Sequence, residues 1–185
     1  MARVDEMYPP DPDGKPRLLL YPTITTHIPF RPTPPYQPDW SLVTSDKPNS
    51  DEATAKAMAD TIDWYDLLPG YINTIEYTFK WLAGYPEQPQ PRESVLILLG
   101  DQQPAGGITG PNATWDVPVH IITSNELLAE RLRLHGFIDG VNPRQESLGH
   151  ISELTLTLLS VFDSGGTQVA GATSVVDSSQ HPAVR

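Results

Sequence analysis

Cysteine is absent from this chain of 185 residues, so the protein has neither disulfide bonds nor thiol chemistry. Basic residues are scarce, because 12 Lys and Arg stand against 23 Asp and Glu, for a formal net charge of −11. Since nucleic-acid backbones are bound through positive charge, this balance argues against a nucleic-acid partner. No apolar run reaches the length of a transmembrane helix. The glycines at 106, 107 and 110 are not followed by Lys-Ser or Lys-Thr, which excludes a phosphate-binding loop.

Proline, by contrast, is abundant at 20 residues, and its distribution predicts an ordered centre with irregular ends. Residues 1–16 are acidic and proline-rich, and we expect them to form an extended arm. Residues 163–185 are rich in Gly, Ser and Thr without periodicity, which is typical of a flexible tail. The stretch between them, residues 17–162, is long enough for one domain with a hydrophobic core.

The most informative stretch is the apolar run Val95–Leu99, which is followed by Gly100, Asp101 and Gln102. Such a short aliphatic run, bounded by turn formers, indicates a strand buried on both faces, as in a parallel sheet. Ligands gather at the carboxyl ends of these strands, so Asp101 is a candidate metal ligand or catalytic group. Asp is also a preferred turn residue, and the alternative is that Asp101 only caps the turn.

Local patterns predict the other elements. We expect strands over residues 18–24 and 117–123, and helices over 51–65, 69–83, 124–135 and 151–162. The helix that starts near Pro69 carries an aliphatic stripe that we expect to be core, made of Leu68, Ile72, Ile75, Phe79 and Leu82. In the helix over 124–135 the residues expected to point inward are Leu127, Leu128 and Leu132, and Gly136 is its expected stop.

The segment 31–40 holds four prolines with Tyr36 and Trp40 between them, which excludes a helix or a sheet interior. It predicts a rigid loop, for which three roles are open. The loop could pack its aromatic rings on the domain surface, form a pocket wall, or present a polyproline-like ligand to a partner. We favour the wall, because the segment leaves directly from His27.

The histidines within residues 17–162 have different expected roles. His27 follows the strand expected over residues 18–24, where it could hydrogen-bond its own loop or serve a functional role as a donor to a ligand. His120 lies inside an expected strand, which favours a packed side chain over a ligand. His135 and His150 lie near helix ends, where a solvated role is the default.

Four segments, in order along the chain, resemble motifs of the alkaline phosphatase and sulfatase superfamily. Thr25–Phe30 is similar to the segment whose His contacts the substrate's phosphate or sulfate group. Val95–Pro104 is similar to the last metal-binding segment, in which a strand ends in Gly-Asp-His. The helix before that strand and the strand after it have counterparts in Pro69–Thr78 and Trp115–Ile121. The resemblance covers roughly Arg17 to Phe162 and is closest to the membrane-anchored, sulfatase-like branch with phosphoglycerol and phosphoethanolamine transferases.

The resemblance implies an α/β fold, here part of a three-layer sandwich with a mostly parallel sheet flanked by helices. Residues 17–162 would form the C-terminal half of that domain. His27 would contact the substrate oxyanion, and Asp101 would bind a divalent zinc, manganese or calcium ion at the same sheet edge. Gln102 stands where the family has a metal-binding His, and an amide oxygen is a poor substitute for imidazole. Because the family's nucleophile and its first acidic metal ligands lie upstream of these segments, we expect weak metal binding or none.

Two functional hypotheses remain. The chain is either a fragment or subunit of a metal-dependent phosphate or sulfate ester hydrolase or transferase, or a noncatalytic derivative that serves in binding or assembly. Half of a large sheet would expose a strand edge and an apolar face, so we expect association with a second copy or another protein chain. The resemblance suggests a periplasmic or other extracytoplasmic, membrane-associated setting.

Overall fold

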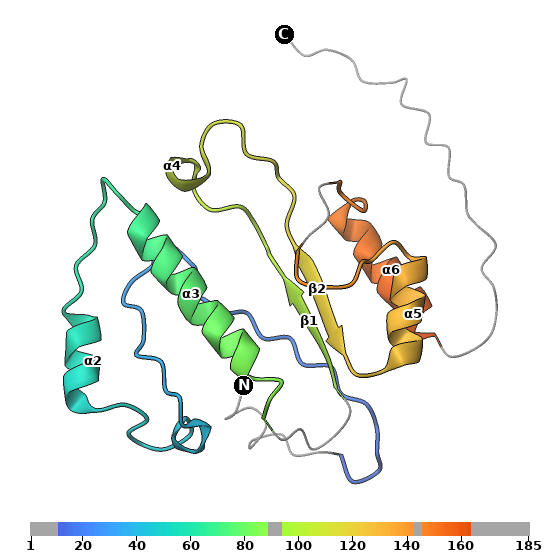
Figure 1. Cartoon of the computed structure of the whole chain (residues 1–185), viewed down its shortest axis with the longest axis horizontal. Helices are drawn as coiled ribbons and strands as arrows, with labels where there is room; N and C mark the ends of the chain where they lie inside the picture. Colours follow the sequence, from blue (N-terminus) through green and yellow to red (C-terminus); the bar gives the residue numbers. More distant parts are fainter. Residues whose placement is uncertain (1–10, 89–93, 143–145, 164–185) are drawn as a thin grey trace. The chain divides into compact units, whose positions relative to one another are not determined.

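The computed structural model describes residues 11–88, 94–142 and 146–163, which belong to two compact units, Met1–Asn125 and Glu126–Arg185 (Figure 1). The first unit contains η1 (Trp40–Leu42), α2 (Asp51–Met58), α3 (Leu68–Gly84), β1 (Val95–Leu99), α4 (Gly106–Thr109) and β2 (Val119–Thr123). The second contains α5 (Glu126–Leu134) and α6 (Ile151–Phe162). The expected mixture of helix and strand is confirmed. Most of the expected arm (1–16) and nearly all of the expected tail (163–185) lie outside the described residues.

The sheet is antiparallel, and the expectation of a mostly parallel sheet in a three-layer sandwich is wrong for the described residues. β1 and β2 pair with Val95 opposite Thr123 and Leu99 opposite Val119, and their arrows point in opposite directions in Figure 1. A parallel pair needs a crossover connection, usually a helix that carries the chain back along the sheet. The connection over residues 100–118 contains only the short α4, and it returns the chain directly into an antiparallel partner.

The strand expected over residues 18–24 is also wrong, since this stretch has no regular structure. Its aliphatic side chains are exposed, with Leu18 at 90% and Leu20 at 94% of their full accessible surface. Pro22 lacks the backbone N–H that pairing in a sheet requires. A strand here would also have exposed aliphatic side chains, so no burial would stabilise it.

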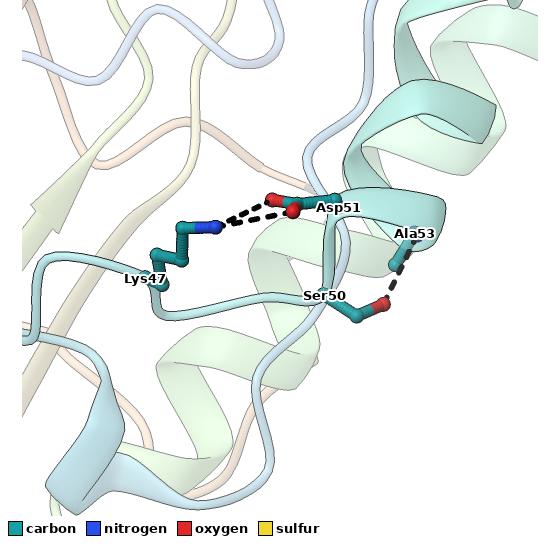
Figure 2. A network of polar contacts seen from close by, with 4 residues as sticks. All are labelled: Lys47, Ser50, Asp51 and Ala53. Atoms are coloured by element: carbon teal, nitrogen blue, oxygen red, sulfur yellow. Dashed lines mark hydrogen bonds and ion pairs between the residues drawn. The ribbon is translucent and has the colours of Figure 1, made fainter.

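α2 begins as expected and ends early. The Ser50 hydroxyl accepts a hydrogen bond from the Ala53 N–H at 3.1 Å, and Lys47 contacts the Asp51 carboxylate at 3.1 Å (Figure 2). The helix ends at Met58 instead of continuing to residue 65. Asp, Thr and Ile, which follow Ala59, are weaker helix formers than the alanines before them. No residue of α2 is buried.

α3 has the expected extent but packs on the other face. Pro69 lies in its first turn, and Lys80 donates to Glu76 at 2.7 Å, which lowers the pKa of that carboxyl. The buried residues are Gly70 and Thr74. The predicted core position is wrong for Leu68, Ile72 and Phe79, which are exposed, whereas Ile75 and Leu82 are half-buried. The face with small and aromatic residues is covered instead.

The covering segment is the proline-rich stretch 31–40. Tyr36 meets Tyr77 of α3 edge-on with ring centroids 6.3 Å apart, and Trp40 lies 6.3 Å from Tyr85. Gly84 makes room for this contact, because a Cβ there would come within 3.0 Å of the Trp40 ring. Of the three roles left open by the sequence, packing of the aromatic rings on the domain is the one these contacts support.

The second unit is a pair of helices. Leu128 and Leu132 of α5 and Val161 of α6 are buried, whereas Leu127 is 70% exposed, so its expected inward orientation is wrong. Gly136, with φ +89°, follows α5 in the left-handed conformation, which confirms it as the stop. None of the helices in the described residues has both the length and the apolar character that crossing a membrane requires.

Candidate functional site

Asp101 and Gln102 lie in the loop that leaves β1. The Gly100 N–H donates to the Pro118 carbonyl at 3.1 Å, which extends the strand pairing by one residue. Beyond them the Gln103 side-chain amide donates to the Asp116 carbonyl. The two residues are therefore held between two cross-loop hydrogen bonds directly past the strand end. The position of Gly100 is tight, since an added Cβ would lie 3.2 Å from the Cδ atom of Pro118.

Both side chains are exposed to solvent. Within the described part of the chain, neither the Asp101 carboxylate nor the Gln102 amide has a hydrogen bond or an ion pair. The alternative role of Asp101, a turn cap made by its carboxylate, therefore has no bond to support it. What the pair offers chemically is one anionic oxygen donor beside one neutral oxygen donor.

His27 lies in a tight turn that is attached to the start of α3. Its N–H donates to the Ile24 carbonyl at 3.0 Å, and its own carbonyl accepts from the Phe30 N–H at 2.8 Å. The ring Nδ1 lies 2.7 Å from the Ile28 carbonyl oxygen, and the side chain is exposed. A local hydrogen bond, one of the two roles open from the sequence, is thus present, and Nε2 has no hydrogen-bond partner among the described residues.

Phe30 anchors this turn, and sequence reasoning did not single it out. It is 2% exposed, sits at φ +64°, and packs on Gly70, where a Cβ would be 3.5 Å from its own. A lone Phe among prolines carries no periodicity, so no pattern identifies it as core. Its proximity to the small residue Gly70 depends on tertiary packing alone.

The structure brings Asp101 and Gln102 together but joins neither to His27. His27 follows no strand, so the geometric reason for placing it at the same sheet edge as Asp101 is gone. No hydrogen bond or ion pair among the described residues connects the two segments. Their shared role stays a prediction from the resemblance.

His120, His135 and His150 lie within the described residues, and each has a local structural environment. His120 is half-buried in β2 opposite Leu98. His150 caps α6, because its ring Nδ1 accepts a hydrogen bond from the Ser152 N–H at 3.3 Å. The Glu153 carboxylate in turn accepts from the His150 backbone N–H, which makes the capping reciprocal.

His135, the residue after α5, has its Nε2 atom 3.1 Å from the Ser160 hydroxyl of α6. This Ser–His pair does not have the arrangement of an activated nucleophile. Ser160 donates its proton to the Thr157 carbonyl at 2.8 Å, so the imidazole Nε2–H is left to donate to the hydroxyl oxygen. The pair links two helices of the second unit.

A metal centre of the family's type needs more donors than these. A catalytic zinc ion takes three protein ligands, and Asp101 and Gln102 supply one carboxylate and one weak amide oxygen. The described residues contain no group of three or more His, Cys, Asp or Glu side chains suited to hold an ion. The residues present therefore do not fit the family's metal centre.

Comparison with known proteins finds no family model, no curated protein and no solved structure that matches this chain. The likeness to sulfatases and alkaline phosphatases thus rests on the four sequence segments and on the position of Asp101.

Proposed function

We propose that this chain is a sulfatase- and alkaline-phosphatase-like protein, a fragment or noncatalytic derivative that does not turn over phosphate or sulfate esters by itself. The observation that carries the proposal is Asp101, which lies exposed just past β1, has no partner among the described residues, and is followed by Gln102. This is the family's Gly-Asp-His position with a neutral amide in place of the imidazole. One carboxylate can attract a divalent cation from solution but cannot fix it in the open geometry that activates a nucleophile.

A second role, binding or assembly with another protein chain, is favoured by the exposed apolar side chains of the first unit. In α3 the exposed fractions are 44% for Leu68, 53% for Ile72 and 60% for Phe79. One face of α3 packs against segment 31–40, and the opposite face presents these apolar side chains to solvent beside a polar stripe of Asn73, Glu76 and Lys80. Association with a second copy or another chain would cover such a surface.

The test is an assay with aryl phosphate and aryl sulfate esters in the presence of zinc, manganese, calcium or magnesium. We expect the purified chain and its Asp101→Ala variant to give the same background rate. Turnover by the wild type that Asp101→Ala abolishes would overturn the noncatalytic proposal and establish an enzyme.

A further inference from the structure

Among the described residues, no strand lies beside the outer edge of β1. β1 and β2 form a two-stranded sheet, so each is paired along one side only. In the part of the chain that the structure describes, β2 alone makes backbone hydrogen bonds to Val95–Leu99. Two strands by themselves are marginally stable in water, and further strands would stabilise the sheet.

β1 also lacks the sequence features that prevent an edge strand from pairing with another chain. Natural edge strands carry charged residues, proline or bulges that block pairing with another chain. β1 consists of Val95, Leu96, Ile97, Leu98 and Leu99, with no charge, proline or glycine. β2 is less suited to pairing, because Pro118 precedes it and His120 lies within it.

We propose that the outer edge of β1 pairs antiparallel with the same edge of a second copy of this chain, around a two-fold axis at Ile97. In this register Val95 faces Leu99 of the second copy, Leu96 faces Leu98, and Ile97 faces Ile97. Every cross-strand pair is aliphatic, so the strand is complementary to itself, as a two-fold interface requires. The result is a four-stranded sheet in the order β2, β1, β1, β2.

Charge opposes this dimer only weakly. Each copy carries a net charge of −11, but β1 itself has no charged residue. At physiological ionic strength, exposed charges more than about 8 Å apart are largely screened. The nearest described acidic residue along the chain, Asp101, lies past the end of the strand, at the rim of the pairing.

This inference rests on the assembly role proposed above and not on the ester chemistry. Turnover of esters would overturn the noncatalytic proposal without affecting the dimer, and a monomer would overturn the dimer without creating turnover. The two failures are therefore distinguishable.

Site-directed cross-linking tests the surface. Because the chain has no cysteine, the variant Ile97→Cys carries a single thiol. At the two-fold axis the two Cβ atoms would lie about 5 Å apart, close enough for a disulfide, so we expect a covalent dimer under mild oxidation. The matched control is Ile121→Cys, the residue opposite Ile97 on β2. Its two thiols would be about 14 Å apart across three strand spacings, so we expect little cross-linking.

Sedimentation of the full chain over a range of concentrations measures the dimer itself. We expect Ile97→Lys to raise the dimer Kd about tenfold or more, because two like charges would face each other across the axis. Ile121→Lys places the same change on β2 of the same sheet and should alter the Kd by about threefold at most, with circular dichroism checking that both variants fold. A wild-type monomer at every concentration, equal cross-linking at the two positions, or equal effects of the two lysines would each overturn the proposal.

Discussion

The ring of Phe30 packs edge-on against the ring of Tyr71 in the first turn of α3, with centroids 5.3 Å apart and planes at 71°. This contact fastens the turn that carries His27 to the helix. Arg31, the next residue, is ion-paired with Asp60, so two consecutive side chains hold this turn in the first unit.

The variant Phe30→Ala should destabilise the protein by about 3 kcal/mol, because it removes a fully buried ring and leaves a cavity. The matched control is Phe79→Ala on α3, whose ring is 60% exposed and whose loss should cost about 1 kcal/mol or less. Denaturant unfolding of both variants measures the difference, and equal losses would contradict the burial of Phe30.

Substituting Gly84 by Ala should destabilise the fold by about 1 kcal/mol, although Ala is the better helix former. The added Cβ would come within 3.0 Å of Trp40 and 3.2 Å of the Tyr36 hydroxyl, and the rings cannot move without losing their contacts with α3. Gly107→Ala in α4 is the control, since nothing lies within 4 Å of its added Cβ. Thermal unfolding should show opposite signs for the two; stabilisation by Gly84→Ala would refute the close approach of Trp40.

Alkaline pH should weaken the first unit through Tyr77. Burial, followed by the nearby charges of Tyr36 and Tyr21, raises the pKa of Tyr77 above its ordinary value of 10.0. The native state thus favours the neutral phenol, and its contribution is fully present below the unfolded pKa. It is lost as pH rises from about 10 through the folded pKa. Unfolding free energies measured from pH 8 upward should fall less steeply for Tyr77→Phe than for the wild type, and parallel curves would contradict the shift.

In the second unit, Arg131→Ala should cost about 1 kcal/mol of stability. Its guanidinium donates to the Val161 carbonyl at 3.1 Å and to the Asp163 carbonyl at 3.0 Å, two groups at the C-terminal end of α6. Arg133→Ala is the control on the same helix, because its exposed ion pair with Asp139 should contribute about 0.5 kcal/mol or less. Urea unfolding followed by helix content compares them, and an equal or larger loss at Arg133 would contradict the capping role.

Introducing an imidazole next to Asp101 by Gln102→His should raise the affinity for zinc or manganese slightly and leave ester turnover undetectable. One nitrogen donor beside the Asp101 carboxylate makes two ligands, which is fewer than the three protein ligands of a catalytic zinc ion. Calorimetric titration with each metal measures the affinity, with the double variant Asp101→Ala, Gln102→His as the control, because it keeps the imidazole and removes the carboxylate. If the metal affinity of Gln102→His equals that of the wild type, Asp101 and its neighbour do not form a metal-binding position.

The sequence by itself determined where most elements begin and end. The aliphatic run Val95–Leu99 is β1, Pro69 opens α3, and Gly136 ends α5, because capping, proline geometry and left-handed glycine act within a few residues of the chain. The position of Asp101 just past the end of β1 could also be predicted from the sequence, because it follows the apolar run after one glycine.

Tertiary structure decided which faces meet. Periodicity marks the aliphatic stripe of α3 as the inner face, yet the small residues Gly70 and Gly84 let the rings of Phe30 and Trp40 approach the backbone on the opposite side. Close approach and ring geometry depend on the partner segment, which periodicity within α3 does not contain. The antiparallel direction of β2 also depends on the tertiary structure. The connection between β1 and β2 contains only the short α4, which cannot carry the chain back along the sheet for parallel pairing.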